Sequence, residues 1–491
     1  MAILDMILIS FYLAVLVCLA VYGFHRSSLV ALYFRHKKKT TRPWGRFDRL
    51  PRVTVQLPMF NEMYVAERLL EATSEIDYPV ELLEIQVLDD STDETRQIAV
   101  DKVEELKKRG FDVSYIHRTD RQGFKAGALE NGLKRAKGEY ILVFDADFIP
   151  NKNVLHETIH FFTDPEVGMV QVRWGHINRD YSPLTQVQSV MLDGHFLIEH
   201  TARYRSGRFF NFNGTAGVWR REAIESSGGW QHDTLTEDLD LSYRAQLKGW
   251  KFVYLPDVLS PAEIPVEMNS FKSQQFRWAK GSIQVACKLL PMVMKSRVPW
   301  KVKVEALFHL TNNFAYPLLF LLSLLLVPNL MVRTTHGWRE VLILDLPLFF
   351  GTTFSVAMFY LITQREDKKS GFLKSLGRIP LVLSLGIGLC VNQSKAVFEA
   401  LRGKTGEFVR TPKTGVVHKV EKWTKRKYRS GVSFVPYVEV FMGLYFVMAM
   451  AAAAINGHWL SMPFIFLFLA GYWYVGIASF VHARAQSRAL E

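Results

Sequence analysis

The stretch that decides the fold is Tyr140-Ile-Leu-Val-Phe-Asp-Ala-Asp147, a short apolar run that ends in two acids. Residues 140–144 predict a buried strand. Alternate residues of an extended chain point the same way, so Asp145 and Asp147 can face one ligand. Two close carboxylates repel each other unless a cation lies nearby. Mg²⁺ is usually held by one or two carboxylates together with substrate phosphates, so the motif fits a nucleotide diphosphate.

Three further apolar runs of strand type precede this one, at residues 53–57, 83–88 and 113–117. Helical patterns lie between them, for instance at 95–109 and 125–137. Alternating strands and helices predict an α/β fold with a parallel sheet and helices on both of its faces. Ligands of such sheets bind beyond the carboxyl ends of the strands.

Acidic residues follow three of the four predicted strands. Pro58-Met-Phe-Asn-Glu62 is expected to break the first strand into a loop, and Asp89-Asp90 ends the second. Acids at such places can also cap helices, because Asp is a favoured N-cap residue; for Asp93 we prefer that interpretation. The coincidence of acids at neighbouring strand ends is the strongest sign of a site.

Two small-residue stretches are candidates for lining that site. Arg121-Gln-Gly-Phe-Lys-Ala-Gly-Ala128 has glycines that permit close backbone approach, and its Lys125 offers a point charge to a phosphate. A basic helix start explains that stretch equally well. Phe210-Asn-Phe-Asn-Gly-Thr-Ala-Gly217 is a loop between aromatic residues that is suited to a sugar.

Thr236-Glu237-Asp238 precedes another helical pattern. A Thr N-cap with acids in the first turn would explain it structurally. The functional interpretation makes one carboxylate a general base that takes a proton from a sugar hydroxyl. Spacing alone does not choose between the two.

Gln274, Arg277 and Trp278 stand at i, i+3 and i+4, so on a helix they share one face. Arg supplies a planar, permanently charged fork of donors for an anionic leaving group. Trp supplies a broad apolar ring for a flat sugar face. An amphipathic helix with a core Trp and a solvated Arg is the alternative.

Charge and cysteine content exclude several classes of protein. The net charge of the 491 residues is +13, and the basic residues cluster beside apolar runs, which favours cytoplasmic loops and lipid headgroups over nucleic acid. The three cysteines (Cys18, Cys287 and Cys390) have neither metal-ligand nor disulfide-framework spacing.

Long apolar segments predict a membrane protein. Residues 3–24 are long enough to cross a bilayer, and the basic residues that follow place the next block in the cytoplasm. We expect three parts: 1–25 as a transmembrane helix, 26–290 as a cytosolic domain and 291–491 as a membrane channel domain. Further spans are predicted at 306–327, 341–363, 433–455 and 459–481, and 381–401 is predicted to be re-entrant or interfacial. Polar and aromatic residues inside these spans could line a channel or make helix contacts: His309, Asn312, Asn313, Tyr437, Glu439 and Trp473.

The motifs above occur in the order found in processive family-two glycosyltransferases, such as cellulose, chitin and hyaluronan synthases. The chain resembles this family over about residues 50–420. It is most similar to the cellulose synthase-like A and C proteins, of the glucomannan mannosyltransferase and xyloglucan-backbone glucan synthase types. The stretches that carry the finer likeness are Val170-Gln-Val-Arg-Trp174, Phe212-Asn-Gly-Thr-Ala-Gly-Val-Trp-Arg220 and Gly249-Trp-Lys-Phe252. Unlike bacterial cellulose synthase, the chain shows no evident regulatory domain after its last span, so we do not expect cyclic-dinucleotide control.

The resemblance implies a nucleotide-diphospho-sugar transferase (GT-A-like) domain inserted in an α-helical transmembrane domain. It implies roles for residues that match the motifs. Asp238 would deprotonate the acceptor hydroxyl, Arg277 and Gln274 would face the leaving diphosphate, and Trp278 would floor the acceptor site. Asp147, with Asp145, would hold a divalent cation, Mg²⁺ or Mn²⁺. The catalytic set implied is Glu237, Asp238, Gln274, Arg277 and Trp278, and the donor-binding set is Pro58, Glu62, Asp89, Asp90, Lys125, Asp145, Phe408, Thr411 and Lys413.

Gly406-Glu-Phe-Val-Arg-Thr-Pro-Lys413 resembles the gating loop of cellulose synthase, so residues 404–415 are expected to close over the nucleotide. An ordinary basic linker is the alternative.

We therefore expect a membrane-embedded, processive, inverting β-glycosyltransferase that builds a β-1,4-glucan or mannan and translocates it. UDP-glucose is the preferred donor and GDP-mannose the second; the sequence does not choose the donor, the linkage or the oligomeric state. The expected partners are the nucleotide sugar, the growing polysaccharide and the lipid bilayer of the cell inner membrane, with the catalytic domain in the cytosol, no nucleic acid and a homo-oligomer allowed. A non-processive glucosyltransferase acting on ceramide or diacylglycerol is the alternative. A transporter with a regulatory nucleotide module would need no base such as Asp238.

Overall fold

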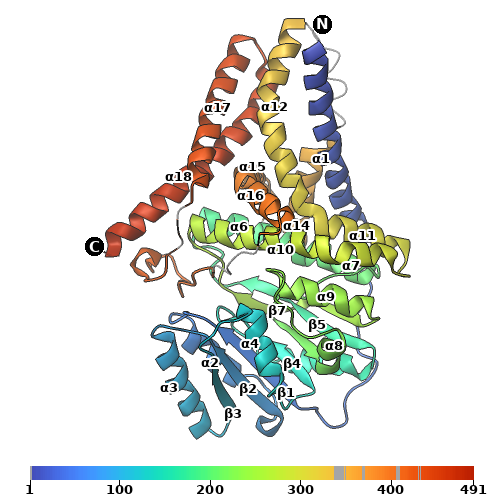
Figure 1. The fold of residues 1–491 in the computed structure, drawn as a ribbon, viewed down its shortest axis with the longest axis vertical. Coiled ribbons are helices and arrows are strands. Elements are labelled where there is room, and N and C mark those ends of the chain that lie inside the picture. The colour runs from blue at the N-terminus through green and yellow to red at the C-terminus, as the bar shows by residue number, and fades with distance from the viewer. Residues whose placement is uncertain are drawn as a thin grey trace.

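The fold is known from a computed structural model that describes residues 3–336, 348, 350–367, 371–404, 410–429, 431 and 433–490. Figure 1 shows two regions: a sheet covered by short helices, and a bundle of long helices that diverge away from it. Long helices that lie across the direction of the bundle separate the two regions.

The sheet has seven strands in the order β3-β2-β1-β4-β6-β5-β7 within the described chain. The first four pair in parallel, as predicted. β6 is antiparallel to both β4 and β5, so the sheet as a whole is mixed. The strands are β1 Val53–Met59, β2 Leu83–Asp89, β3 Asp112–His117, β4 Tyr140–Val143, β5 Val167–His176, β6 Gly217–Arg220 and β7 Lys251–Ala262.

Pro58 does not break β1, contrary to our prediction, but pairs in register with Leu88 of β2. On its other side β1 pairs with β4 only as far as Gln56, opposite Val143. No neighbouring strand therefore requires the N–H that proline lacks. The chain leaves the sheet only after Met59, one residue beyond the proline.

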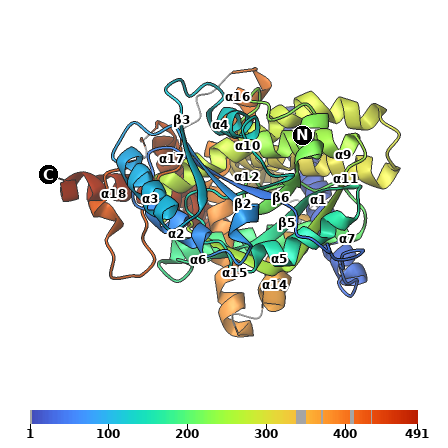
Figure 2. The same ribbon diagram turned by 90° about the horizontal axis from the view of Figure 1, so that it is seen from below.

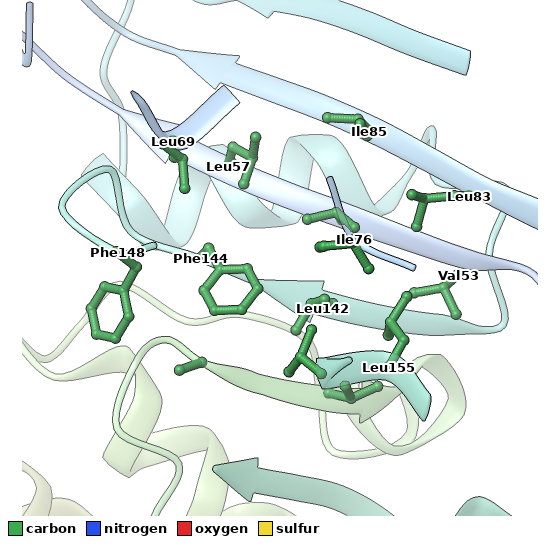
Figure 3. Close-up of a cluster of buried hydrophobic side chains, with 14 of the residues drawn as sticks. Val53, Leu57, Leu69, Ile76, Leu83, Ile85, Leu142, Phe144, Phe148 and Leu155 are labelled. Atoms are coloured by element: carbon green, nitrogen blue, oxygen red, sulfur yellow. The ribbon is translucent and has the colours of Figure 1, made fainter. Parts of the chain in front are cut away.

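Apolar residues cover both faces of the sheet, as the run of buried strands predicts. One face packs against α2 (Ala66–Ser74), α3 (Thr95–Lys108) and α5 (Val154–Thr158), in the cluster of Figure 3 that includes Leu57, Leu69 and Phe144. The other face packs against α4 (Phe124–Leu133), α8 (Arg221–Ser226) and α9 (Glu237–Leu247). The predicted α/β fold with helices on both faces is confirmed.

The remaining helices lie on the bundle side of the sheet or in the bundle itself. They are α1 Ile3–His36, α6 Pro183–Asp193, the π-helix η3 Gly194–His200, α7 Thr201–Arg205, α10 Met268–Lys295, α11 Trp300–Thr311, α12 Ala315–His336, α14 Ser355–Asp367, α15 Phe372–Gly388, α16 Cys390–Leu401, α17 Val435–Ile455 and α18 Met462–Leu490. Seen from below, α10 lies behind the strands, on the bundle side of the sheet (Figure 2).

Four helical stretches within the described ranges are long and apolar enough to cross a membrane: Ile3–His36, Trp300–Val332, Val435–Ile455 and Trp459–Ala489. They overlap four of the five predicted spans. In the predicted span 341–363, residues 341–347 and 349 lie outside the described residues. The ambiguous stretch 381–401 falls on α15 and α16, which are bent by 41° at their junction and form either a broken span or a re-entrant pair.

Helix α10 is tied to the bundle by polar groups buried in the interface. Lys272 of α10 forms an ion pair with Glu439 of α17, with Nζ 2.7 Å from Oε2, and both side chains are buried. Asn392 of α16 donates to the Lys272 carbonyl at 3.0 Å, and Asn269 donates to the Ser479 carbonyl of α18 at 2.9 Å. These contacts fix the position of α10 relative to the membrane helices.

Removing one partner of the Lys272–Glu439 pair leaves the other charge buried and unpaired. We expect Lys272→Met to lower the free energy of unfolding by about 3 kcal/mol, and the double variant Lys272→Met with Glu439→Met to recover most of that loss. Denaturant or thermal unfolding of detergent-solubilised protein measures both. Equal destabilisation of the single and double variants would contradict this.

Candidate active site

One pocket of about 160 Å³ collects nearly every residue that the sequence proposed for a site. It lies beyond the carboxyl ends of β1 and β4, where a ligand site is expected in an open α/β sheet. Helices α9 and α10 and the segment 410–413 complete its wall. The predicted residues that line it are Pro58, Glu62, Asp90, Lys125, Asp145, Asp147, Glu237, Asp238, Gln274, Arg277, Trp278, Thr411 and Lys413.

Two predicted residues are not among those lining the pocket. Asp89 is fully buried, and its carboxylate accepts hydrogen bonds from the Tyr115 hydroxyl (2.7 Å) and the Ser91 N–H (2.9 Å). Asp89 therefore shapes the turn that presents Asp90 and does not line the pocket. Phe408 lies outside the described residues. Asp93 accepts a hydrogen bond from the N–H of Thr95, the first residue of α3, at 3.0 Å, but the N-cap position itself is Glu94.

At one end of the pocket, Asp90 is held by an arginine that the sequence analysis did not assign to the site. Arg118 donates to both oxygens of Asp90, Nη2 to Oδ2 at 2.5 Å and Nε to Oδ1 at 2.9 Å. Nearby, the Arg121 guanidinium lies over the Phe60 ring, 3.3 Å from its centroid. Both Phe60 and Arg121 line the pocket. This end offers a flat, cationic surface next to a fixed carboxylate.

The two acids of the Asp-x-Asp motif each contact a lysine. Lys125 pairs with Asp145 and also donates to the Gly214 carbonyl at 2.9 Å, while Lys413 pairs with Asp147. Within the described ranges, no group of three or more His, Cys, Asp or Glu could hold a metal ion. The two carboxylates still fit a divalent ion that takes its remaining ligands from phosphate, as Mg²⁺ commonly does.

Asp238 lies in the first turn of α9, half-buried next to Glu237, and Lys125 acts on it electrostatically. Burial and the neighbouring Glu237 carboxylate raise the pKa of Asp238 to about 7. Burial also raises the pKa of Glu237. The side chain of Thr236 makes no capping hydrogen bond, and its hydroxyl is a buried group without a partner in the described part of the chain. The structural explanation of this motif as a simple cap is therefore incomplete.

Helix α10 presents Gln274, Arg277 and Trp278 to the pocket from one face, as their spacing predicts. The helix can approach α9 closely because residue 281 is glycine: a Cβ there would lie 2.5 Å from Cγ2 of Thr236. Burial lowers the pKa of Arg277, and the acids of the pocket oppose that shift. Arg277 and Asp238 are thus brought together by the packing of α10 on α9.

The segment after residue 409 is anchored to the sheet domain. Glu263, which directly follows β7, accepts from the Thr414 N–H (3.0 Å), the Thr414 hydroxyl (2.9 Å) and the Gly415 N–H (3.0 Å). Arg410 donates to the Phe60 carbonyl at 3.0 Å. Sequence reasoning missed Glu263 and Arg410, although the position of Glu263 at the end of a strand was an available signal.

The chain is similar in sequence to proteins of known families. A sequence profile described as "Glycosyltransferase like family 2" matches residues 51–281. This part of the chain, slightly less than half of its length, is similar to the family-two glycosyltransferases. The predicted relationship is supported for these residues, and most of the residues that line the pocket lie within the matched range.

The curated relatives point to one branch of the family. The chain is 42% identical over 252 residues to "Probable glucomannan 4-beta-mannosyltransferase 7" of Oryza sativa subsp. japonica, covering 50% of this chain and 43% of that protein. It is 40% identical over 255 residues to "Glucomannan 4-beta-mannosyltransferase 2" of Arabidopsis thaliana, covering 51% and 48%. The chain spans about half the length of the curated relatives it matches.

Among solved structures, a mannosyltransferase of Pyrobaculum calidifontis, in complex with GDP-Man and Mn²⁺, is similar in fold. Its TM-score is 0.50 at 23% identity, over 73% of this chain and 100% of that one. The likeness supports the GT-A-like fold of the sheet domain.

Gly214 has a left-handed backbone (φ 80°), and a Cβ there would lie 3.1 Å from Oδ2 of Asp238 and 3.4 Å from Nζ of Lys125. We expect Gly214→Ala to cost about 1 kcal/mol in unfolding free energy from its backbone alone. We also expect it to displace the Asp238 carboxylate and so weaken any ligand of this end of the pocket. Thermal unfolding and nucleotide-sugar titration measure the two effects. Gly249→Ala, also at positive φ but with nothing within 4 Å, is the matched control; equal ligand binding by both variants would contradict the packing argument.

Proposed function

We propose that the protein is a membrane-embedded, inverting β-glycosyltransferase that transfers hexose from a nucleotide sugar to the end of a growing polysaccharide. One observation carries the proposal. A half-buried carboxyl with a pKa of about 7 (Asp238), a half-buried arginine and tryptophan (Arg277 and Trp278) and the Asp145–Asp147 pair share one pocket. A one-step displacement needs a base, a cation for the leaving group, a surface for the sugar and a binding site for the diphosphate. In the order given, these residues would supply them.

In this reaction, Asp238 takes the proton of the acceptor hydroxyl as its oxygen attacks the anomeric carbon of the donor. The new glycosidic bond forms as the bond from that carbon to the diphosphate oxygen breaks, and the electron pair leaves with the nucleoside diphosphate. Attack from the opposite face inverts the anomeric carbon and requires no enzyme nucleophile.

The leaving diphosphate is anionic, and the side chains of Arg277 and Lys125 are cations that interact electrostatically with Asp238 and Asp145 in the pocket. Fixed charges in a site that excludes water stabilise developing charge strongly. A divalent cation, Mg²⁺ or Mn²⁺, held by Asp147 and Asp145 would add neutralisation of the diphosphate when bound.

The donor that we favour is GDP-mannose, because both relatives described above are named as glucomannan mannosyltransferases. This departs from the order of preference that the sequence alone suggested, in which UDP-glucose came first. The product would be a β-1,4-linked mannan or glucomannan. A ceramide or diacylglycerol acceptor receives no support from these relatives.

The spatial organisation belongs to the same proposal. Residues 1–25 and 291–491 would form the membrane channel domain, and 26–290 the catalytic domain on the cytosolic side of the inner membrane. Residues 404–415 would act as a gate, and the contacts of Lys413 with Asp147 and of Thr414 with Glu263 support this role.

The basic experiment supplies purified protein in lipid vesicles with GDP-mannose or UDP-glucose, each with Mg²⁺ or Mn²⁺, and digests the products with linkage-specific hydrolases. A polymer cut by β-1,4-mannanase supports the proposal. Transfer to a lipid alone, or no transfer from either donor, overturns it.

We expect Asp238→Asn to lower kcat for transfer by at least about a hundredfold, the usual contribution of a general base. The affinity for the donor should change little, because the amide keeps the size of the side chain. Radiolabelled sugar incorporation and donor titration measure the two quantities. Asp257→Asn, an exposed acid on β7 away from the pocket, is the control; full activity of Asp238→Asn would remove the proposed base.

The pH dependence of kcat should follow the ionisation of Asp238. A base must be deprotonated to accept a proton, and its pKa is raised to about 7. The rate should therefore rise about tenfold per pH unit below that value and level off above it. Steady-state rates between about pH 5 and pH 9 test this, and a rate independent of pH in the lower half of that range would contradict it.

A further inference from the structure

Asn213 is a pocket residue whose side-chain oxygen has no partner. Its backbone N–H donates to Oε1 of Gln171 at 3.0 Å, which fixes the main chain at that point. Its Oδ1 is buried and accepts no hydrogen bond within the described part of the chain. A buried carbonyl oxygen left without a donor is costly, so a ligand that donates to it gains accordingly. The next residue, Gly214, lies against the Asp238 carboxylate, so Asn213 is beside the proposed base.

The other end of the Asn213 amide is held by a histidine outside the pocket wall. Nδ2 of Asn213 lies 2.9 Å from Nε2 of His195, and Nδ1 of the same ring lies 3.4 Å from Oε2 of Glu199. His195 and Glu199 belong to the π-helix η3, whose wider turn places residues i and i+4 on one side. Single π-helical turns within helices occur frequently at functional sites.

Charge on Glu199 decides the direction of the hydrogen bonds. Burial would raise the pKa of Glu199, but Arg203 and His195 outweigh it and hold that pKa well below its usual value. Nη1 of Arg203 is 3.3 Å from Glu199, and its Nε donates to Glu305 of α11 at 2.9 Å. Glu199 is therefore a fixed carboxylate that can only accept hydrogen bonds.

The tautomer of His195 follows from that charge. A carboxylate at Nδ1 requires the ring proton to be there, so a neutral ring presents Nε2 as an acceptor. The Asn213 amide must then donate its NH₂ to His195. Its carbonyl oxygen is thereby turned away from the histidine, which accounts for the oxygen that lacks a partner.

We propose that His195 and Glu199 are positioning residues that present the Asn213 carbonyl oxygen to a hydroxyl group of a hexose in the pocket. The hydroxyl belongs either to the donor sugar or to the terminal residue of the growing chain. This inference rests on the proposed function and adds a determinant of sugar specificity to it. A site that accepts a hydrogen bond from a substrate hydroxyl discriminates strongly against a substrate analogue without that hydroxyl.

The test compares intact sugars with their monodeoxy analogues. GDP-mannose is replaced in turn by 2-, 3-, 4- and 6-deoxy donors, and separately β-1,4-mannotetraose primers carry a deoxy terminal residue. Affinity is measured by titration and kcat/KM by transfer. For one analogue, the affinity and kcat/KM of the parent enzyme should be about tenfold lower than for the intact sugar, the effect of one neutral hydrogen bond. Whether that analogue is a donor or a primer identifies the sugar that supplies the hydroxyl.

Three variants separate positioning from general structure. Asn213→Ala removes the acceptor, so its affinity and kcat/KM for the intact sugar should fall about tenfold. Its values for that one analogue and for the intact sugar should then be equal. Glu199→Ala should do the same without touching the sugar: it removes the carboxylate that holds the ring proton on Nδ1 of His195, so the proton can lie on Nε2 and the Asn213 amide can turn round, while Arg203 keeps its ion pair with Glu305. Asn213→Asp keeps an oxygen acceptor and should retain the discrimination.

His156→Ala is the matched control, because His156 pairs with Asp77 at 3.6 Å on the exposed side of the sheet domain. It should behave as the parent does. If Asn213→Ala and Glu199→Ala, with unchanged thermal unfolding, still discriminate against every analogue as the parent does, the inference is wrong. A parent that transfers no hexose contradicts the proposed function instead, and the titrations of the analogues still decide the role of His195 and Glu199.

Discussion

The structure depends on holding several carboxylates in one pocket, where their mutual repulsion must be balanced by cations. Four acids from two distant parts of the sequence line the same pocket: Asp145, Asp147, Glu237 and Asp238. Each group has a cation supplied from elsewhere: Lys125 from α4, Lys413 from the segment after α16 and Arg277 from α10. Because buried charges are tolerated only when they are paired, the position of these three cations sets the position of the helices that carry them.

The sequence was sufficient for the parts of the fold that follow from local pattern. Apolar runs with helices between them predict the four parallel strands, and acids after those runs predict the edge where the pocket lies. The spacing of Gln274, Arg277 and Trp278 predicts that they share a helix face, which they do. In each case the signal lies within one element, so no knowledge of the tertiary structure is needed.

The parts that could not be predicted depend on contacts between distant segments. β6 has four residues, too few to show a period, and its antiparallel direction follows from the path of the chain through α6, η3 and α7. Pro58 is compatible with β1 only because β4 stops at the level of Gln56. Asp89 and Asp90 are adjacent in the chain, yet Tyr115 and Arg118 draw their side chains into different surroundings. Nothing in a pair of consecutive acids distinguishes these two outcomes.

Helix α10 carries the ion pair that ties it to α17 at Lys272, and the proposed acceptor platform at Trp278, six positions later. At a rise of about 1.5 Å per residue these two points are only about 9 Å apart along the axis, roughly the length of two sugar units. In the proposed reaction a newly joined sugar would therefore need to advance very little before it met the membrane helices. Synthesis and export would therefore be coupled over a short distance, and the polymer would not be released into water between the two steps.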